Sequence, residues 1–278
     1  MKTIIKSFSH LNLERHITGD KDWGKATLLD EIQKSSPRFV DSYDKLVMEV
    51  AQILHYNRNI NLYYRGQSKD YKENGKTTIY PSIFRDKGKK RIMLKDRFKL
   101  LDEKVEKLKV CLKNQSNKIL GLQMINKYPE IGWSLLQHYE VCDTPLLDLS
   151  RSLHVACSFA QDANAGDTGI VYVLGMPWQL DAFGYNSHEE LVNIELLTVC
   201  PPQAQRPFFQ EGYLVGPFPN YQLDHPQRRR QFDFARRLVA KFKIPNTPDF
   251  WDEGFTQIPA SKLYPPNDPM YDLCKLIK

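Results

Sequence analysis

The sequence lacks the features that mark membrane-spanning and metal-binding proteins. No apolar run approaches the length of about 18 residues that a transmembrane helix needs, so we expect no membrane segment. The first ten residues contain two lysines but no long apolar core, which is not the pattern of a signal peptide. Five cysteines are scattered without a C-x-x-C pair or a histidine-rich partner segment, so we expect no metal site.

Several catalytic motifs are also missing. The absence of G-x-S-x-G speaks against a serine hydrolase, and there is neither a phosphate-binding P-loop nor a dinucleotide glycine fingerprint. The odd cysteine count and the apolar neighbours of Cys157 and Cys274 predict reduced core thiols in a cytoplasmic protein. Cys142 follows His138 by four residues and is conceivable as a nucleophile, although no third group that would orient the histidine is evident.

The composition predicts a folded protein with local concentrations of positive charge. With 278 residues, 41% of them apolar, we expect residues 42–278 to form one large domain and residues 1–41 an N-terminal arm with a short helix. The net charge of +6 is concentrated at 87–109 and 228–237. Basic faces usually stay solvated, but they can also attract nucleic acid or a phosphate-bearing ligand.

Periodicity in the apolar residues predicts an α+β fold with a mixed, mainly antiparallel sheet and surrounding helices. Residues 188–199 fit a strand and a helix equally well. Residues 79–85 read as an extended apolar segment. Helices are expected at 27–33, 42–57, 87–114, 119–127, 131–138, 152–160, 227–240 and 270–277. Strands are expected at 61–66, 146–150, 169–174, 208–215 and 241–245.

The chain appears organised around residues 135–160, where polar side chains crowd a junction between apolar segments. His138 and Tyr139 end one predicted helix, and Asp148 and Ser150 lie on a short strand before the next. A junction of this kind suits a binding site on a rigid scaffold. Asp148 and Ser150 also suit the capping of the following helix, and the residues alone leave both interpretations open.

Three further segments place polar groups among apolar residues: Arg65-Gly66-Gln67, Ser82 with Arg85, and Arg206 with Gln210 and Glu211. A buried arginine needs a partner or an anionic ligand, because an isolated charge in the core is prohibitive. For Arg65 the alternatives are a ligand site and an ion pair with Asp148 or Glu211. Gly66 would let the backbone approach a ligand closely.

Five motifs together resemble the FRG domain family, in an order and spacing that extend over residues 42–278. They are Y-Y-R-G-Q (63–67), Y-P-S-I-F-R (80–85), L-L-Q-H-Y-E-x-x-D-T-P-L-L-D-L (135–149), S-L-H-V-A-C-S-F-A (152–160) and R-x-x-x-Q-x-G (206–212). The central motif is the most specific. It departs from the usual family form at Glu140, which replaces a glycine, at Pro145, which replaces an arginine, and at Leu149 and Ser150.

The same motif order is similar to that of the ADP-ribosyltransferase superfamily, and this resemblance implies NAD as substrate. It implies a split-sheet fold in which Arg65 and Gly66 hold the nicotinamide ribose and carboxamide. Residues 147–150 would form the Ser-Thr-Ser-like element, with 155–160 as its helix. Gln210 or Glu211 would replace the catalytic glutamate. The remaining nucleotide contacts would come from Gln67, Ser82, Arg85, His138, Tyr139, Asp148 and Ser150.

The leading hypothesis is therefore an ADP-ribosyltransferase-like domain that binds NAD or a related nucleotide. It would transfer ADP-ribose to a protein or nucleic-acid acceptor, and the resemblance implies a bacterial toxin or phage-conflict setting. A second hypothesis is a nucleic-acid-binding module that uses the basic residues at 87–91, 228–230, 236 and 237. A third is an inactive protein-interaction domain, favoured by the amide at Gln210 and the altered central motif.

Overall fold

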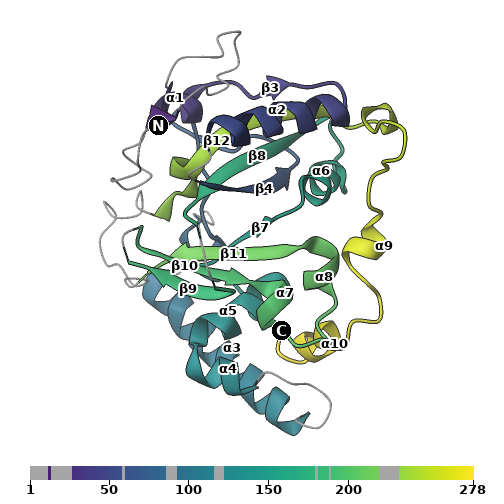
Figure 1. The fold of residues 1–278 in the computed structure, drawn as a ribbon. Coiled ribbons are helices and arrows are strands. Elements are labelled where there is room, and N and C mark those ends of the chain that lie inside the picture. The colour runs from purple at the N-terminus through teal and green to yellow at the C-terminus, as the bar shows by residue number, and fades with distance from the viewer. Residues whose placement is uncertain are drawn as a thin grey trace. The chain divides into compact units, whose positions relative to one another are not determined.

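The computed structural model describes residues 12–13, 27–57, 60–85, 93–115, 122–178, 181–187, 189–218 and 232–278 (Figure 1). The chain divides into two compact units, and each is described by itself. The first unit comprises Met1–Ile79, Leu149–Trp178 and Phe234–Ala260. The second comprises Tyr80–Asp148, Gln179–Asp233 and Ser261–Lys278.

The first unit is built on a sheet in which β12 and β8 are the longest strands. Its strands are β3 (Arg38–Phe39), β12 (Leu238–Pro245), β8 (Thr168–Met176) and β4 (Asn61–Gln67), in that order. Only the β3–β12 pair is parallel among these, so the prediction of a mixed, mainly antiparallel sheet in an α+β fold is confirmed. Tyr64 of β4 also pairs with Ser150, the last residue of β7 (Leu147–Ser150). Likeness to the ADP-ribosyltransferase fold stays a prediction.

Two serine caps fix where the principal helices of this unit begin. Ser42 precedes α2 (Tyr43–Tyr56), and its Oγ accepts a hydrogen bond from the Lys45 amide at 3.4 Å. Ser152 does the same for α6 (Leu153–Gln161) through the Val155 amide at 3.3 Å. Both starts agree with the sequence prediction. The smaller elements are β1 (Asn12–Leu13), β2 (Thr27–Leu28), α1 (Leu29–Lys34), β5 (Lys72–Glu73), β6 (Lys76–Thr77), η4 (Phe234–Arg237) and η5 (Pro248–Phe250).

Helix α6 lies directly on β4 and β8, and two glycines make this contact possible. A Cβ atom on Gly66 would lie 1.9 Å from the carbonyl oxygen of Ala156, and one on Gly169 would lie 2.4 Å from that of Ala160. The close approach at Gly66 is therefore the approach of a helix, whereas the sequence suggested the approach of a ligand. Because side chains alternate along a strand, Arg65 points to the face of β4 opposite α6.

The second unit contains a three-stranded antiparallel arrangement and most of the helices. Its strands are β9 (Phe183–Asn186), β10 (Leu191–Glu195) and β11 (Gly212–Pro217). Its helices are η2 (Ser82–Phe84), α3 (Leu94–Asn114), α4 (Leu122–Lys127), α5 (Pro129–His138), α7 (Leu196–Val199), α8 (Arg206–Gln210) and α10 (Pro269–Lys275). The short α9 (Ala260–Leu263) begins at the boundary between units. The ambiguous stretch 188–199 contains both expected elements, since β10 ends at Glu195 and α7 begins at the next residue.

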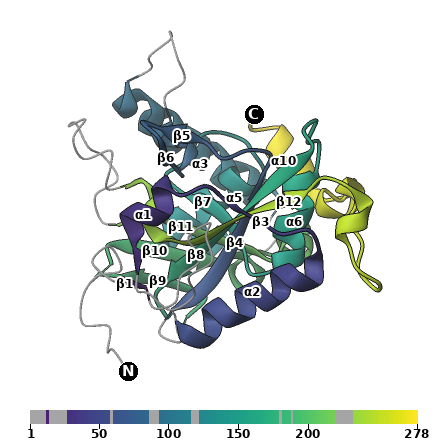
Figure 2. The same ribbon diagram turned by 90° about the horizontal axis from the view of Figure 1, so that it is seen from above.

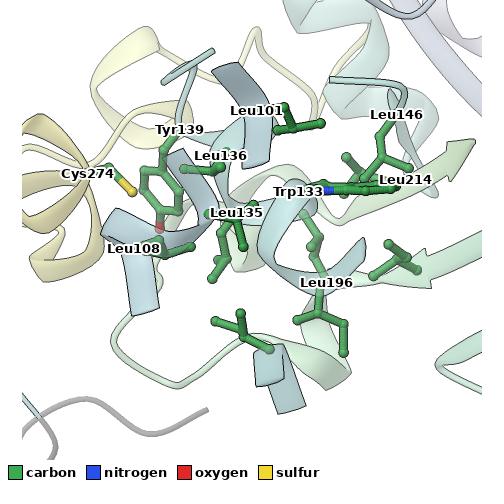
Figure 3. Close-up of a cluster of buried hydrophobic side chains, with 14 of the residues drawn as sticks. Leu101, Leu108, Trp133, Leu135, Leu136, Tyr139, Leu146, Leu196, Leu214 and Cys274 are labelled. Atoms are coloured by element: carbon green, nitrogen blue, oxygen red, sulfur yellow. The ribbon is translucent and has the colours of Figure 1, made fainter. Parts of the chain in front are cut away.

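A large apolar cluster holds the helices of the second unit together (Figure 3). Leu101 and Leu108 of α3 belong to it, as do Leu135 and Leu136 of α5. Met93, which the helix expected at 87–114 also included, is 70% exposed and lies just before α3, which begins at Leu94.

Two sequence predictions are wrong where tertiary pairing overrides local pattern. The helix expected at 227–240 is replaced by the short η4 turn and by β12, which begins at Leu238 and pairs with β8 along its length. The strand expected at 208–215 starts only at Gly212. It is preceded by α8, which has a proline at its first turn and a left-handed residue, Glu211, at its end. Residues 227–231 lie outside the described residues.

The region before residue 42 contains α1, close to the short helix predicted at 27–33, and β3, which pairs with β12. The boundary at 41 stays a prediction. None of the helices in the described part of the chain combines the length and apolar character that a bilayer crossing needs.

The α6 contact predicts a large effect of a single methyl group. Gly66→Ala should lower the free energy of unfolding by about 3 kcal/mol or more, since its Cβ would overlap backbone atoms that cannot move aside. Urea unfolding measures the change. Gly166→Ala is the matched control, because its Cβ would meet nothing closer than 3.4 Å. Equal stability of the two variants would contradict the packing of α6 on β4.

Candidate functional site

Asp148 of β7 is a partly exposed acidic residue whose carboxylate is held by two neighbouring side chains. Its Oδ1 lies 3.2 Å from Nδ1 of His138, and its Oδ2 accepts a hydrogen bond from Nε2 of Gln137 at 3.1 Å. The histidine side chain is 3% exposed, whereas the aspartate side chain is 30% exposed. Two groups at the end of α5 therefore fix a carboxylate that still reaches solvent.

A second set of hydrogen bonds fixes the amide of Gln137. Its Oε1 accepts from Oγ1 of Thr144 at 2.6 Å and from Oγ of Ser82 at 3.2 Å. The amide N–H of Thr144 in turn donates to Oγ of Ser82 at 3.0 Å. Because Oε1 accepts both bonds, Nε2 must face Asp148. Two motif segments that are far apart in the sequence, 80–85 and 135–149, thus meet at one acidic residue.

Other residues of these motifs have structural contacts. Arg85 is exposed and donates through Nε to the carbonyl oxygen of Tyr80 at 2.9 Å. Tyr139 is fully buried, and its hydroxyl donates to Oδ2 of Asp268 at 2.7 Å. Burial, reinforced by this carboxylate, raises the pKa of Tyr139 far above its usual value. Tyr139 therefore lies in the core of the second unit (Figure 3).

Arg206 of α8 is buried among aromatic rings. It is 6% exposed, and its guanidinium carbon lies 5.2, 5.1 and 4.5 Å from the ring centroids of Tyr139, Tyr264 and Tyr271. Within the described residues it forms no ion pair; its backbone N–H donates to the buried carboxylate of Asp268 at 3.0 Å. The faces of three tyrosines therefore stabilise this cation in place of a directly bound acid.

Gln210 and Glu211 end the same short helix. Nε2 of Gln210, a buried residue, donates to the carbonyl oxygen of Leu263 at 2.7 Å. Glu211 follows in the left-handed conformation with φ of 43°. The strand expected at 208–215 does not include them, because it begins only at Gly212. The contacts of Arg206 and Gln210 secure the C-terminal segment 263–271.

In the first unit, Arg65 lies in a polar row that crosses three strands. It pairs with Tyr172 of β8, and Tyr172 pairs with Lys241 of β12, so all three side chains occupy the same face. Asp70 accepts from the Tyr172 hydroxyl at 2.9 Å and from Nζ of Lys241 at 3.4 Å. Arg65 itself is partly exposed.

Lys241 is a buried lysine that the sequence reasoning missed. Its side chain is 1% exposed, and Nζ donates to Oγ1 of Thr77 at 2.7 Å and to the carbonyl oxygens of Gln33 and Ser35. Burial lowers its pKa, and the carboxylate of Asp70 opposes that change. The sequence does contain a sign of this burial. Lys241 lies between apolar residues, and a strand as apolar as this one is expected to be buried.

Ser150 lies on the other face of the sheet from Arg65. It is opposite Tyr64, and its Oγ accepts a hydrogen bond from the Ser152 amide at 3.0 Å. It therefore supports the entry to α6, in agreement with the alternative interpretation of this junction. Gln67 ends β4 and pairs with Ile170, and it is partly exposed.

With this geometry established, the comparison with known families is informative. A family model described as the FRG domain matches residues 60–168. The chain contains an FRG domain. Comparison with curated proteins and with solved structures gave no match.

The FRG match extends from the residue before β4 to the first residue of β8. It includes Arg65, the Gly66 contact with α6, and the whole hydrogen-bond network around Asp148. The R-x-x-x-Q-x-G motif at 206–212 lies beyond it. The segment shared with the family thus carries the part-exposed carboxylate, whereas Gln210 and Glu211 belong to a later segment. A cleft shared by Arg65 and Gln210 stays a prediction.

The thiols of the FRG domain and its flanks are free and mostly buried. Burial, with a smaller contribution from Asp143, raises the pKa of Cys142 to about 12. Burial also raises the pKa values of Cys157 and Cys200, and that of Cys274 to about 12. A thiol with such a pKa is protonated at neutral pH, which argues against Cys142 as a nucleophile. The prediction of core thiols at Cys157 and Cys274 is confirmed.

The nucleic-acid hypothesis depended in part on a basic helix face that included Arg236 and Arg237. In the structure these two residues end the short η4. Arg237 is buried at the end of η4, directly before β12. Only Arg236 of this pair is partly exposed. The basic residues at 87–91 and 228–230 lie outside the described residues.

Removing the guanidinium of Arg206 should destabilise the second unit. Arg206→Ala is expected to lower the free energy of unfolding by about 2 kcal/mol or more, because three ring contacts and the packing of the side chain are lost. Chemical denaturation checks this, with the exposed Arg151→Ala as the control. A cost no larger than that of the control would show that the tyrosines do not stabilise the cation.

Thiol labelling tests the burial of Cys142 and Cys274. With a pKa of about 12, each is thiolate to roughly one part in 10,000 at pH 8, and only the thiolate reacts. Both should label at least about 100-fold more slowly in the native chain than in urea, and the native rate should rise with pH. Peptide mapping after timed labelling gives the rates. Rapid native labelling of Cys142 at pH 8 would restore it as a candidate nucleophile.

Proposed function

We propose that the FRG domain binds NAD or a related nucleotide and transfers its ADP-ribose group, with Asp148 as the acidic residue. The observation that supports this most directly is the Asp148 carboxylate, oriented by Gln137 and His138 and still 30% exposed. An acidic residue that only caps a helix or forms an ion pair does not need access to solvent. An oriented, accessible carboxylate in the segment shared with the family suits a role toward a ligand.

The chemistry of the proposed reaction favours a carboxylate in this role. Loss of nicotinamide builds positive charge on the ribose, and a fixed negative charge beside it lowers the barrier. Gln210 is neutral, buried and bonded to the carbonyl of Leu263, so it offers less electrostatic help. Glu211 retains a charge, but it caps a helix in a left-handed conformation. Asp148 is therefore the better candidate of the three.

The residues around Asp148 fit a polar, uncharged part of a nucleotide. Hydroxyl and amide groups dominate the network around this carboxylate. Such a carboxylate can accept a hydrogen bond from a ribose hydroxyl. Arg65, in the first unit, stays in the proposal as the group expected to meet the pyrophosphate or ribose oxygens of NAD.

The biological setting comes from the family resemblance. We propose a cytoplasmic bacterial or phage-encoded protein that acts in toxin or phage conflict and modifies a protein or nucleic acid. The mechanism requires no metal. Within the described residues, no three histidine, cysteine or acidic side chains gather closely enough to hold one.

A pair of variants separates binding from transfer. Asp148→Asn should bind NAD within about threefold of the wild type but lose at least about 100-fold in the rate of transfer from labelled NAD, because only the charge is removed. Calorimetry measures the binding, and incorporation of label into cell extract measures the transfer. Exposed Asp181→Asn is the matched control. Unimpaired transfer by Asp148→Asn would remove this residue from the mechanism.

The same calorimetric titration tests Arg65. Arg65→Ala is expected to weaken NAD binding at least about tenfold, as charge-assisted hydrogen bonds to the nucleotide are lost. Thermal unfolding of each variant establishes that the fold is intact. Full NAD binding by Arg65→Ala would exclude Arg65 from the site, and no binding by the wild type would refute the proposed function.

A further inference from the structure

Helix α2 of the first unit has two apolar stripes where one is usual. The inward stripe consists of the buried residues Tyr43, Leu46, Val50 and Ile53. The second stripe faces solvent and consists of the exposed residues Val47, Met48, Ala51 and Leu54. A helix that only covers a core keeps its other face polar. The second stripe therefore suits a further contact.

The exposed stripe continues onto the edge of the sheet. Figures 1 and 2 show α2 and the segment of β3. Together they line a groove of about 340 Å³, to which β3 and its continuation contribute residues 38–41 and α2 contributes Lys45, Met48, Glu49 and Gln52. Phe39 and Met48, which flank the groove, are 54% and 63% exposed. We call the exposed α2 stripe, Phe39 and this groove the α2 surface.

Among the described residues, no strand pairs with the outer side of β3 at this edge. The amide N–H of Val40 donates to the carbonyl of Lys243 on β12 at 3.0 Å. In a parallel ladder the neighbouring residue then directs its own N–H and C=O away from the partner strand, so those of Phe39 point outward. An open edge can accept another chain, although a strand of two residues contributes little alone.

Charge indicates which kind of partner fits. The α2 surface carries two bases and two acids, joined as the pairs Arg38–Glu49 and Lys45–Asp41. It is locally neutral, whereas the whole chain has a net charge of +6. A neutral surface with paired charges does not attract nucleic acid or a strongly acidic partner. It is, however, suited to a copy of itself, since two-fold contact requires self-complementary charge.

We propose that the α2 surface is the contact between two copies of this chain, related by a two-fold axis. A two-fold contact joins the same patch on both copies. An apolar side chain of each copy can therefore fill the groove of the other. Met48 is best suited to the partner's groove, because its side chain is exposed and adapts to irregular space. The contact also covers Val47 and Leu54, which a monomer leaves in water.

Sedimentation equilibrium of the full chain across a concentration series tests the proposal. The wild type should be a dimer that dissociates on dilution. Met48→Glu should weaken association at least about 100-fold, because the charge would be buried in the contact. Met93→Glu is the matched control: it makes the same change of charge at a residue that is 70% exposed and belongs to the second unit.

Leu54→Glu provides a second variant on the same stripe and should also dissociate the dimer. Circular dichroism of each variant confirms that α2 is folded. A wild type that remains monomeric at the highest concentration would overturn the proposal. So would a Met48→Glu variant that remains dimeric, or a Met93→Glu variant that dissociates equally.

Discussion

The direct contact of α6 with β4 and β8 is the constraint on which the first unit depends. It requires the absence of a side chain at Gly66 and Gly169, where a Cβ would overlap the helix backbone. Since the helix occupies that face, the neighbouring Arg65 must point to the other one, into a row with Tyr172 and Lys241. Each residue of the Arg65-Gly66 pair therefore has a structural role. The glycine allows α6 to pack on the strand, and the alternation of side chains along β4 directs the arginine to the opposite face.

In the second unit, the corresponding constraint is the orientation of one acidic side chain, that of Asp148. Gln137 can present its amide nitrogen to Asp148 only because Thr144 and Ser82 occupy its oxygen. Ser82 comes from one motif segment, and Gln137, Thr144 and Asp148 come from another. The family pattern in this region thus describes a hydrogen-bond network, in which Ser82, Thr144 and Gln137 position the carboxylate of Asp148.

Local patterns predicted much of this structure. The caps at Ser42 and Ser152, the helical stripe of α3 and the strand of the Y-R-G-Q motif follow from spacing and side-chain chemistry. The start of β12 and the helix α8 do not follow from local pattern. Pairing with β8 determines where β12 begins, and α8 forms at a turn that has a proline in its first positions. The meeting of Ser82, Gln137 and Asp148 was beyond prediction from spacing alone. The buried Lys241 was missed because its four partners come from two segments, 33–35 and 70–77, that are more than 160 residues away in the sequence.

The order of the chain has a consequence for biosynthesis. The first unit is assembled from three separate segments, and β12, which pairs with β3 and β8, lies in the last of them. β3, whose partner in the sheet is β12, must therefore wait for that partner while the ribosome synthesises residues 80–148 and 179–233 of the second unit. The second unit in turn receives Tyr264, Asp268 and Tyr271 only after the last segment of the first unit has been synthesised. Neither unit can therefore be completed before segments of the other have been synthesised, so exposed strands should need protection during synthesis.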